Sequence, residues 1–123
     1  MNNLILDTDS YKLTHWKQYP PKTEVVYSYF ESRGGMFPAT TFFGLQYFLK
    51  KYLEGVVITA AKIDEAEGFV AAHLGDKGMF NRAGWEHILI QHGGRLPVVI
   101  RAVPEGTTVD NLTPLVTIEN TDP

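Results

Sequence analysis

The last third of the chain contains three β-strand segments joined by short turns, and this pattern limits the fold more than any other feature. The segments span residues 96–103, 107–109 and 115–119, with a turn at residues 104–106 between the first two. Parallel strands need a crossover connection of about a dozen residues or more, and these turns are too short to hold one. The segments therefore predict an antiparallel sheet.

Helices are predicted before this sheet. A short helix is expected to begin at Thr8 or Asp9, either of which can cap it, and to end at about Tyr19, before a proline pair. Residues 23–32 alternate β-branched and aromatic side chains, which predicts a strand. Apolar residues at helical spacing predict further helices over residues 40–52, over residues 60–74 behind a Thr59 cap, and from an Asn81 cap to the glycines at residues 93–94.

The order of elements is thus α, β, three α and three β. A run of helices followed by a run of strands is typical of α+β proteins. We therefore predict a small, mostly antiparallel sheet with three to four helices, in a single domain over residues 1–123.

Composition excludes several classes of function. The chain has 123 residues, a net charge of −3 and no cysteine. Disulfides, thiolate metal sites and thiol catalysis are therefore excluded, and a nucleic-acid partner, which usually requires a basic surface, is not expected. The first residues lack the features of a signal peptide, and no segment approaches the ~20 apolar residues that span a bilayer. We expect a cytoplasmic protein with no membrane partner.

The common catalytic motifs are absent. The chain contains no glycine-rich phosphate loop and no His-x-x-x-His pair, and its histidines are scattered at positions 15, 73, 87 and 92. His73 lies on an apolar helical face, where a structural role is expected, while His87 and His92 flank a predicted helix C-terminus. We expect no metal site.

The polar beginning of the chain is the strongest candidate for chemistry. In an extended segment the side chains of Asp9 and Tyr11 would share a face, so the carboxylate could orient the phenol or a nearby cation. The tyrosine ring could also stack on a flat heteroaromatic ligand. The alternative is that Asp9 caps the helix and Tyr11 packs against it.

Arg33 is a second candidate. It follows a predicted strand and precedes Gly34 and Gly35, which permit close approach of a ligand. Its guanidinium group matches the geometry of phosphate. The alternative is an arginine that is exposed to solvent or paired with Glu31.

Short blocks along most of the chain carry a resemblance to a known family. They comprise residues 8–12, 14–15, 17–21, 26–31, 33, 43–47, 84–85, 96–97, 102–106 and 119–123. In this order they resemble the N-terminal domain of nicotinamide phosphoribosyltransferases, which are type II phosphoribosyltransferases. The chain departs from the family in the short loop after Arg33, where a longer lysine-rich insertion is common. It also ends at Pro123, before the catalytic α/β barrel, which is therefore expected to be absent.

The resemblance implies a function. Family members form nicotinamide mononucleotide and pyrophosphate from nicotinamide and phosphoribosyl pyrophosphate, using Mg²⁺ and stimulated by ATP. Their active site lies at a homodimer interface, where the N-terminal domain of one subunit closes a site on the barrel of the other. Tyr11 would stack on the pyridine ring, Arg33 would bind phosphate and Asp9 would orient these contacts. No catalytic residue or cofactor is expected in the chain itself.

Two hypotheses follow. In the first, the chain is part of this enzyme, and alone it should turn over no substrate because the barrel residues are missing. In the second, it is an interaction or oligomerisation module that keeps the fold without catalysis. Such a module should expose apolar surface.

Overall fold

The computed structural model describes residues 3–123, which form two compact units. Unit 1 comprises the residues up to Lys22 together with Tyr52–Leu96, and unit 2 comprises Thr23–Lys51 and Pro97–Pro123. The chain therefore leaves unit 1, builds part of unit 2, returns to unit 1 and finishes in unit 2. The single domain over residues 1–123 stays a prediction beside this division.

Unit 1 is helical. Its elements are the 3₁₀-helices η1 (Leu4–Leu6), η2 (Ser10–Gln18) and η4 (Lys77–Met79) and the α-helices α2 (Ala60–Leu74) and α3 (Arg82–Gln91). The Thr59 hydroxyl accepts a hydrogen bond from the backbone N–H of Lys62, and the Asn81 side chain accepts one from that of Gly84. Both helices thus begin at the caps that the sequence predicts, because a capping side chain satisfies an otherwise unpaired N–H group.

The core of unit 1 lies between α2 and the segments around it. Ile58, Ile63 and Val70 are fully buried, and burial of each such side chain stabilises a fold by about 1.5–3 kcal/mol. The remaining buried core residues are Ile5, Val57, Ala66 and Phe80. Ile58, Ile63 and Val70 lie on or just before α2, so this helix is the centre of the unit.

Close backbone packing also holds unit 1 together. The carbonyl of Gly94 accepts hydrogen bonds from the backbone N–H groups of Val57 and Ile58, both at 3.0 Å. Gly94 has a φ of +77°, and a Cβ atom there would clash with the carbonyl oxygen of Ile58. The second glycine after α3 is therefore required both for its backbone angle and for this contact.

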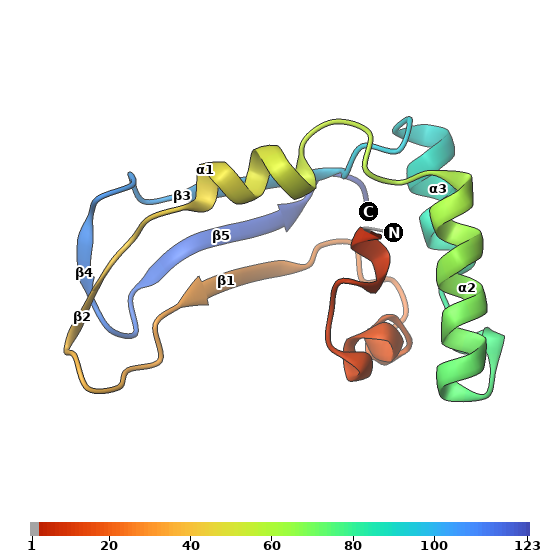
Figure 1. The fold of residues 1–123 in the computed structure, drawn as a ribbon, viewed down its shortest axis with the longest axis horizontal. Helices are drawn as coiled ribbons and strands as arrows, with labels where there is room; N and C mark the ends of the chain where they lie inside the picture. Colours follow the sequence, from red (N-terminus) through yellow and green to blue (C-terminus); the bar gives the residue numbers. More distant parts are fainter. Residues whose placement is uncertain (1–2) are drawn as a thin grey trace. The chain divides into compact units, whose positions relative to one another are not determined.

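Unit 2 contains two antiparallel sheets. Strands β1 (Tyr27–Glu31), β5 (Pro114–Asn120) and β3 (Val98–Ala102) form one sheet with β5 in the centre, and β2 (Ala39–Thr41) pairs with β4 (Thr108–Asp110) in the other. Figure 1 shows β1 and β5 side by side. Tyr27 lies opposite Glu119, and Ile100 lies opposite Ile118. The prediction of an antiparallel arrangement is confirmed.

The helix predicted over residues 40–52 is wrong in its first part. Thr40 and Thr41 belong to β2, and α1 begins only at Leu45, after Gly44 with a φ of +100°. It spans Leu45–Phe48 and continues as the π-helical turn η3 (Leu49–Leu53). Pairing with β4 holds residues 39–41 extended, so a tertiary contact overrides the local helical pattern.

Two other predicted elements also differ. The strand predicted over residues 23–32 is shorter, since only β1 pairs with β5. The first helix has the predicted extent, but it is a 3₁₀-helix, and the side chain of Asp9 makes no capping hydrogen bond. Asp9 instead binds Lys12, as described below, so its charge is used in an ion pair rather than at the helix end.

The core of unit 2 is small. Its buried residues are Phe42, Leu115 and Val116. Many of its large apolar side chains remain exposed, among them Tyr27, Tyr29, Phe30, Phe37, Phe43, Tyr47 and Phe48. Since Tyr29 and Phe30 are neighbours on one strand, they point to opposite faces, and both faces of β1 are uncovered.

The fold class is the predicted one. The described residues form a small α+β protein with antiparallel sheets, and residues 3–123 contain no closed barrel. Within the same residues no helix combines the length and the apolar character that crossing a membrane requires.

Candidate functional site

The helix η2 presents Tyr11 to solvent. About 62% of the surface of Tyr11 is exposed, and its ring lies 5.3 Å from the ring of His15, at an interplanar angle of 56°. The backbone carbonyl of Tyr11 accepts a hydrogen bond from the Thr14 hydroxyl. An exposed aromatic ring with its backbone fixed by a helical turn can stack on a flat ligand at little conformational cost.

Asp9 and Lys12 form an ion pair beside this tyrosine. The Lys12 Nζ lies 2.8 Å from the Asp9 carboxylate and 5.5 Å from the centre of the Tyr11 ring. The hydrogen bond and the positive charge of Lys12 lower the pKa of Asp9 below its ordinary value of 3.8, and Asp9 raises the pKa of Lys12 in the same way. Asp9 is therefore ionised at neutral pH, and its partner is a cation of its own helix.

Two side-chain hydrogen bonds hold η2 against the rest of unit 1. The Ser10 hydroxyl and His73 Nε2 are 2.7 Å apart, and the indole N–H of Trp16 donates to the carbonyl of Met79 at 2.9 Å. These bonds lie on both sides of Tyr11 in the sequence. In η2 only the partly buried Leu13 packs against the core, so these bonds help to fix the position of Tyr11.

The surroundings of His73 therefore differ from those that the sequence predicts. Its side chain is exposed rather than packed into an apolar face, and its ring stacks on Phe69 at 5.6 Å. Its structural role is the hydrogen bond to Ser10, which connects α2 to η2.

Arg33 lies in unit 2, just beyond β1. It is exposed, and the structure gives it no hydrogen bond or ion pair with any residue from 3 to 123, so it is solvated rather than paired with Glu31. The preceding residue is fixed: the Ser32 hydroxyl donates to Asn111 Oδ1 at 2.8 Å, and the Ser32 carbonyl accepts from Leu112 at 2.8 Å. Arg33 is thus an exposed cation that directly follows a residue held by two hydrogen bonds.

The candidate residues are divided between the two units. Asp9 and Tyr11 lie together in unit 1, at the beginning of η2, whereas Arg33 belongs to unit 2. The structure thus brings together the first two residues that the sequence singles out.

A cavity beside η2 was not predicted. Its volume is about 500 Å³, which lies within the range of small-molecule sites. Its polar side chains are Asp7, Thr8, Lys12 and Asn81, and its aromatic side chains are Trp16, Phe80 and Trp85. The only sequence signal for it is that both tryptophans of the chain contribute to it, and nothing in their spacing places them together.

Comparison with known proteins identifies the family. The family described as "Nicotinamide phosphoribosyltransferase, N-terminal domain" matches residues 3–100. A protein of Xanthomonas campestris pv. campestris (strain 8004) named "Nicotinamide phosphoribosyltransferase" is 52% identical over 99% of this chain. A protein of the same name from Acinetobacter baylyi is 33% identical over 92% of the chain. The chain spans about a quarter of the length of each relative. It therefore belongs to the nicotinamide phosphoribosyltransferase family, and the match falls on the N-terminal domain.

Proposed function

We propose that this chain is the N-terminal part of an enzyme of NAD salvage that forms nicotinamide mononucleotide and pyrophosphate from nicotinamide and phosphoribosyl pyrophosphate. The observation that carries the proposal is the family match over residues 3–100, which includes the segment that presents Tyr11 to solvent. The chain contributes binding groups, and an α/β barrel supplies the rest of the active site.

The reaction needs little acid–base chemistry from this chain. The pyridine nitrogen of nicotinamide attacks the anomeric carbon of the ribose, a C–N bond forms, and the C–O bond to pyrophosphate breaks. Positive charge develops on the ribose and negative charge on the leaving group. Catalysis then depends on holding the ring in line with the ribose and on stabilising the departing charge.

Tyr11 serves the first requirement and Arg33 the second. The exposed ring of Tyr11 stacks on the pyridine ring, and Asp9, fixed by its ion pair with Lys12, orients this contact. Arg33 reaches phosphate with a guanidinium group that is not already neutralised by a partner among residues 3–123. The chain closes the active site of a partner subunit in a homodimer, so these residues complete a site rather than form one.

Mg²⁺ and ATP are expected to act elsewhere in the enzyme. Mg²⁺ prefers oxygen ligands, chiefly carboxylates and phosphates. It is usually bound by one or two carboxylates together with substrate phosphates, and we assign no carboxylate of this chain to it. We derive no step through it.

The experiment is reconstitution from two parts. The chain is mixed with the remaining three-quarters of the Xanthomonas relative, nicotinamide and phosphoribosyl pyrophosphate are added, and the mononucleotide is measured. The chain alone should give none, and the mixture should be active. Mononucleotide formed by the chain alone would overturn the proposal that a barrel supplies the rest of the active site. No activity from the mixture, or from the two parts joined in one polypeptide, would contradict the proposal.

The exposed aromatic side chains of unit 2 favour one alternative, an interaction or oligomerisation module without catalysis. Sedimentation over a range of concentrations separates the two functions. The module predicts self-association, or binding to a barrel, without restored activity. A strictly monomeric chain with no affinity for a barrel would count against both.

A further inference from the structure

We propose that His87 and His92 together bind one divalent transition-metal ion of the nickel, copper or zinc type. This site is independent of the function proposed above, and the sequence alone predicts no metal here. Imidazole nitrogens are common ligands of these ions, and two of them on a rigid element can chelate one ion.

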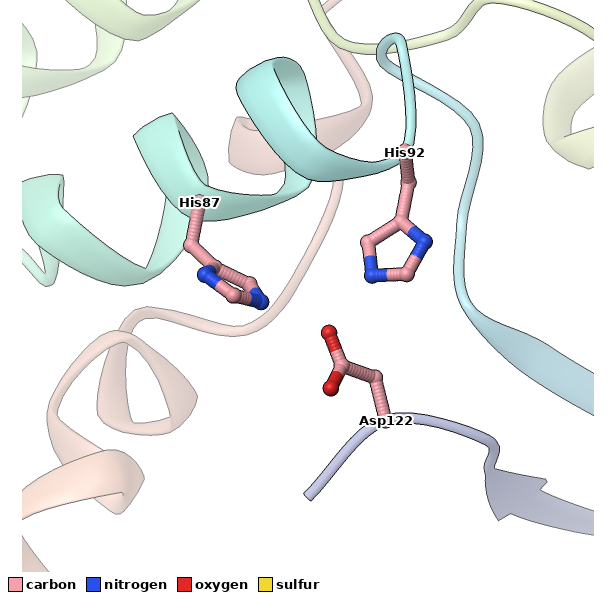
Figure 2. Close-up of side chains that lie close together, drawn as sticks. All are labelled: His87, His92 and Asp122. Atoms are coloured by element: carbon pink, nitrogen blue, oxygen red, sulfur yellow. The ribbon is translucent and has the colours of Figure 1, made fainter.

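The first observation is the geometry of the pair. A ring nitrogen of His87 lies within 4.8 Å of a ring nitrogen of His92, and the ring centres are 5.8 Å apart at an interplanar angle of 64°. Figure 2 shows both side chains extending from the same side of the end of α3. Two metal–nitrogen bonds of about 2.1 Å at a tetrahedral angle require the nitrogens to be about 3.4 Å apart. Small rotations of the two side chains can bring the ring nitrogens to this separation.

The second observation is that the backbone fixes the pair. His87 lies inside α3, and His92 is the residue directly after it, with φ −115° and ψ 9°. In a continuous helix residues five apart point about 140° away from each other. His92 departs from helical backbone angles, its N–H still donates to the carbonyl of Ile88 at 3.1 Å, and the two rings lie close together despite this spacing.

The surroundings favour a cation. The negative end of the helix dipole lies at the C-terminus of α3, where a positive charge is stabilised. His87 is exposed and His92 is half-buried, so an ion can enter and keep water as its remaining ligands. Imidazole is a poor ligand for Mg²⁺, so the ion is distinct from the one that accompanies phosphoribosyl pyrophosphate.

The test is metal titration of the untagged 123-residue chain after treatment with a chelator. Zn²⁺ and Ni²⁺ are added separately, with calorimetry and NMR of the histidine rings as readouts. One ion should bind per chain, and the ring signals of His87 and His92 should shift before those of His15 and His73. Mg²⁺ should give neither effect.

Variants assign the site. His87→Ala and the more conservative His87→Gln should each lower Zn²⁺ affinity at least roughly tenfold. Loss of a residue that only supports a metal ligand already costs this much, and His87 is proposed as a ligand itself. His73→Ala is the matched control, because it removes a histidine elsewhere in the same unit, and its affinity should equal that of the parent chain. Circular dichroism verifies that each variant is folded. Unchanged affinity in both His87 variants, an equal loss in His73→Ala, or no binding of either ion at millimolar concentration would overturn the proposal.

Discussion

The two units differ in how much of their apolar surface they bury themselves. Unit 1 encloses seven buried core residues around α2, whereas unit 2 encloses three around β5. In unit 2, Phe43 is 83% exposed and Phe37 is 71% exposed. Large exposed apolar patches on a protein surface often mark sites where a partner binds. Unit 1 therefore has the larger core of its own, and unit 2 leaves more of its large apolar side chains exposed.

The same contrast recurs inside unit 1 on a smaller scale. The helix α2 contributes three buried residues to the core, and η2, which carries Tyr11, contributes none. The element that is proposed to touch substrate is thus held by side-chain hydrogen bonds and by the partly buried Leu13, with no fully buried residue of its own. Binding elements are commonly drawn from the less stable parts of a fold.

Removing core volume from unit 1 should have the largest effect. Ile63→Ala is expected to lower the free energy of unfolding by about 2–5 kcal/mol, because Ile63 is only 1% exposed and a cavity would remain. Ile90→Ala is the matched control, since Ile90 is 72% exposed, and it should change stability by less than about 0.5 kcal/mol. Thermal or urea unfolding measures both. Equal effects would show that α2 is not the centre of the unit.

Hydrogen exchange should separate the units without any mutation. Amides of α2 are expected to exchange at least roughly tenfold more slowly than those of β1, an edge strand whose faces are uncovered. Exchange followed by NMR gives both rates. Protection of β1 equal to that of α2 would contradict the difference between the units.

Loss of a single hydrogen bond should test how η2 is held. Trp16→Phe removes the indole N–H that donates to the Met79 carbonyl, and we expect a loss of about 0.5–1.5 kcal/mol in unfolding free energy. The control is Tyr19→Phe, because the Tyr19 hydroxyl makes no hydrogen bond with any residue from 3 to 123. If Trp16→Phe were as neutral as the control in chemical unfolding, the bond would not anchor η2.

The smallest effect concerns the titration of Asp9. Lys12→Met should return the pKa of Asp9 toward 3.8, because the hydrogen bond and charge that lower it are removed. Since folding lowers the pKa of Asp9, the ion pair stabilises the fold at pH values above the ordinary pKa. This stabilisation is lost as the pH falls through the lowered pKa. Carbon-detected NMR titration measures the midpoint. Lys17→Met is the control and should leave it unchanged.

Two helix caps are predictable from local sequence alone, whereas the cap predicted at Asp9 is absent. The caps Thr59 and Asn81 depend on neighbouring residues alone and lie where the sequence predicts them. The helix at residues 40–41 was wrong because β4, more than 60 positions away, pairs with this segment. The division into two units cannot be predicted from a change of composition along the chain, because each unit is built from two separate segments.

The candidate site was predictable only in part. Asp9 and Tyr11 were singled out by residue type, but the partner of Asp9 and the hydrogen bond from Ser10 to His73 depend on the folded structure. The pairing of His87 with His92 was missed because a spacing of five does not place two residues on one helical face. The roles of Tyr11, Arg33 and Asp9 toward substrate stay predictions.

The central claim is that Tyr11 supplies a stacking surface for nicotinamide. Its most direct test is the KM for nicotinamide of an enzyme in which this chain replaces the N-terminal quarter of the Xanthomonas relative. Loss of aromatic stacking costs about 0.5–1.5 kcal/mol beyond lost contact area, so Tyr11→Ala should raise this KM roughly tenfold. Tyr11→Phe, which keeps the ring, should resemble the parent. A KM for Tyr11→Ala equal to that of the parent would contradict the account.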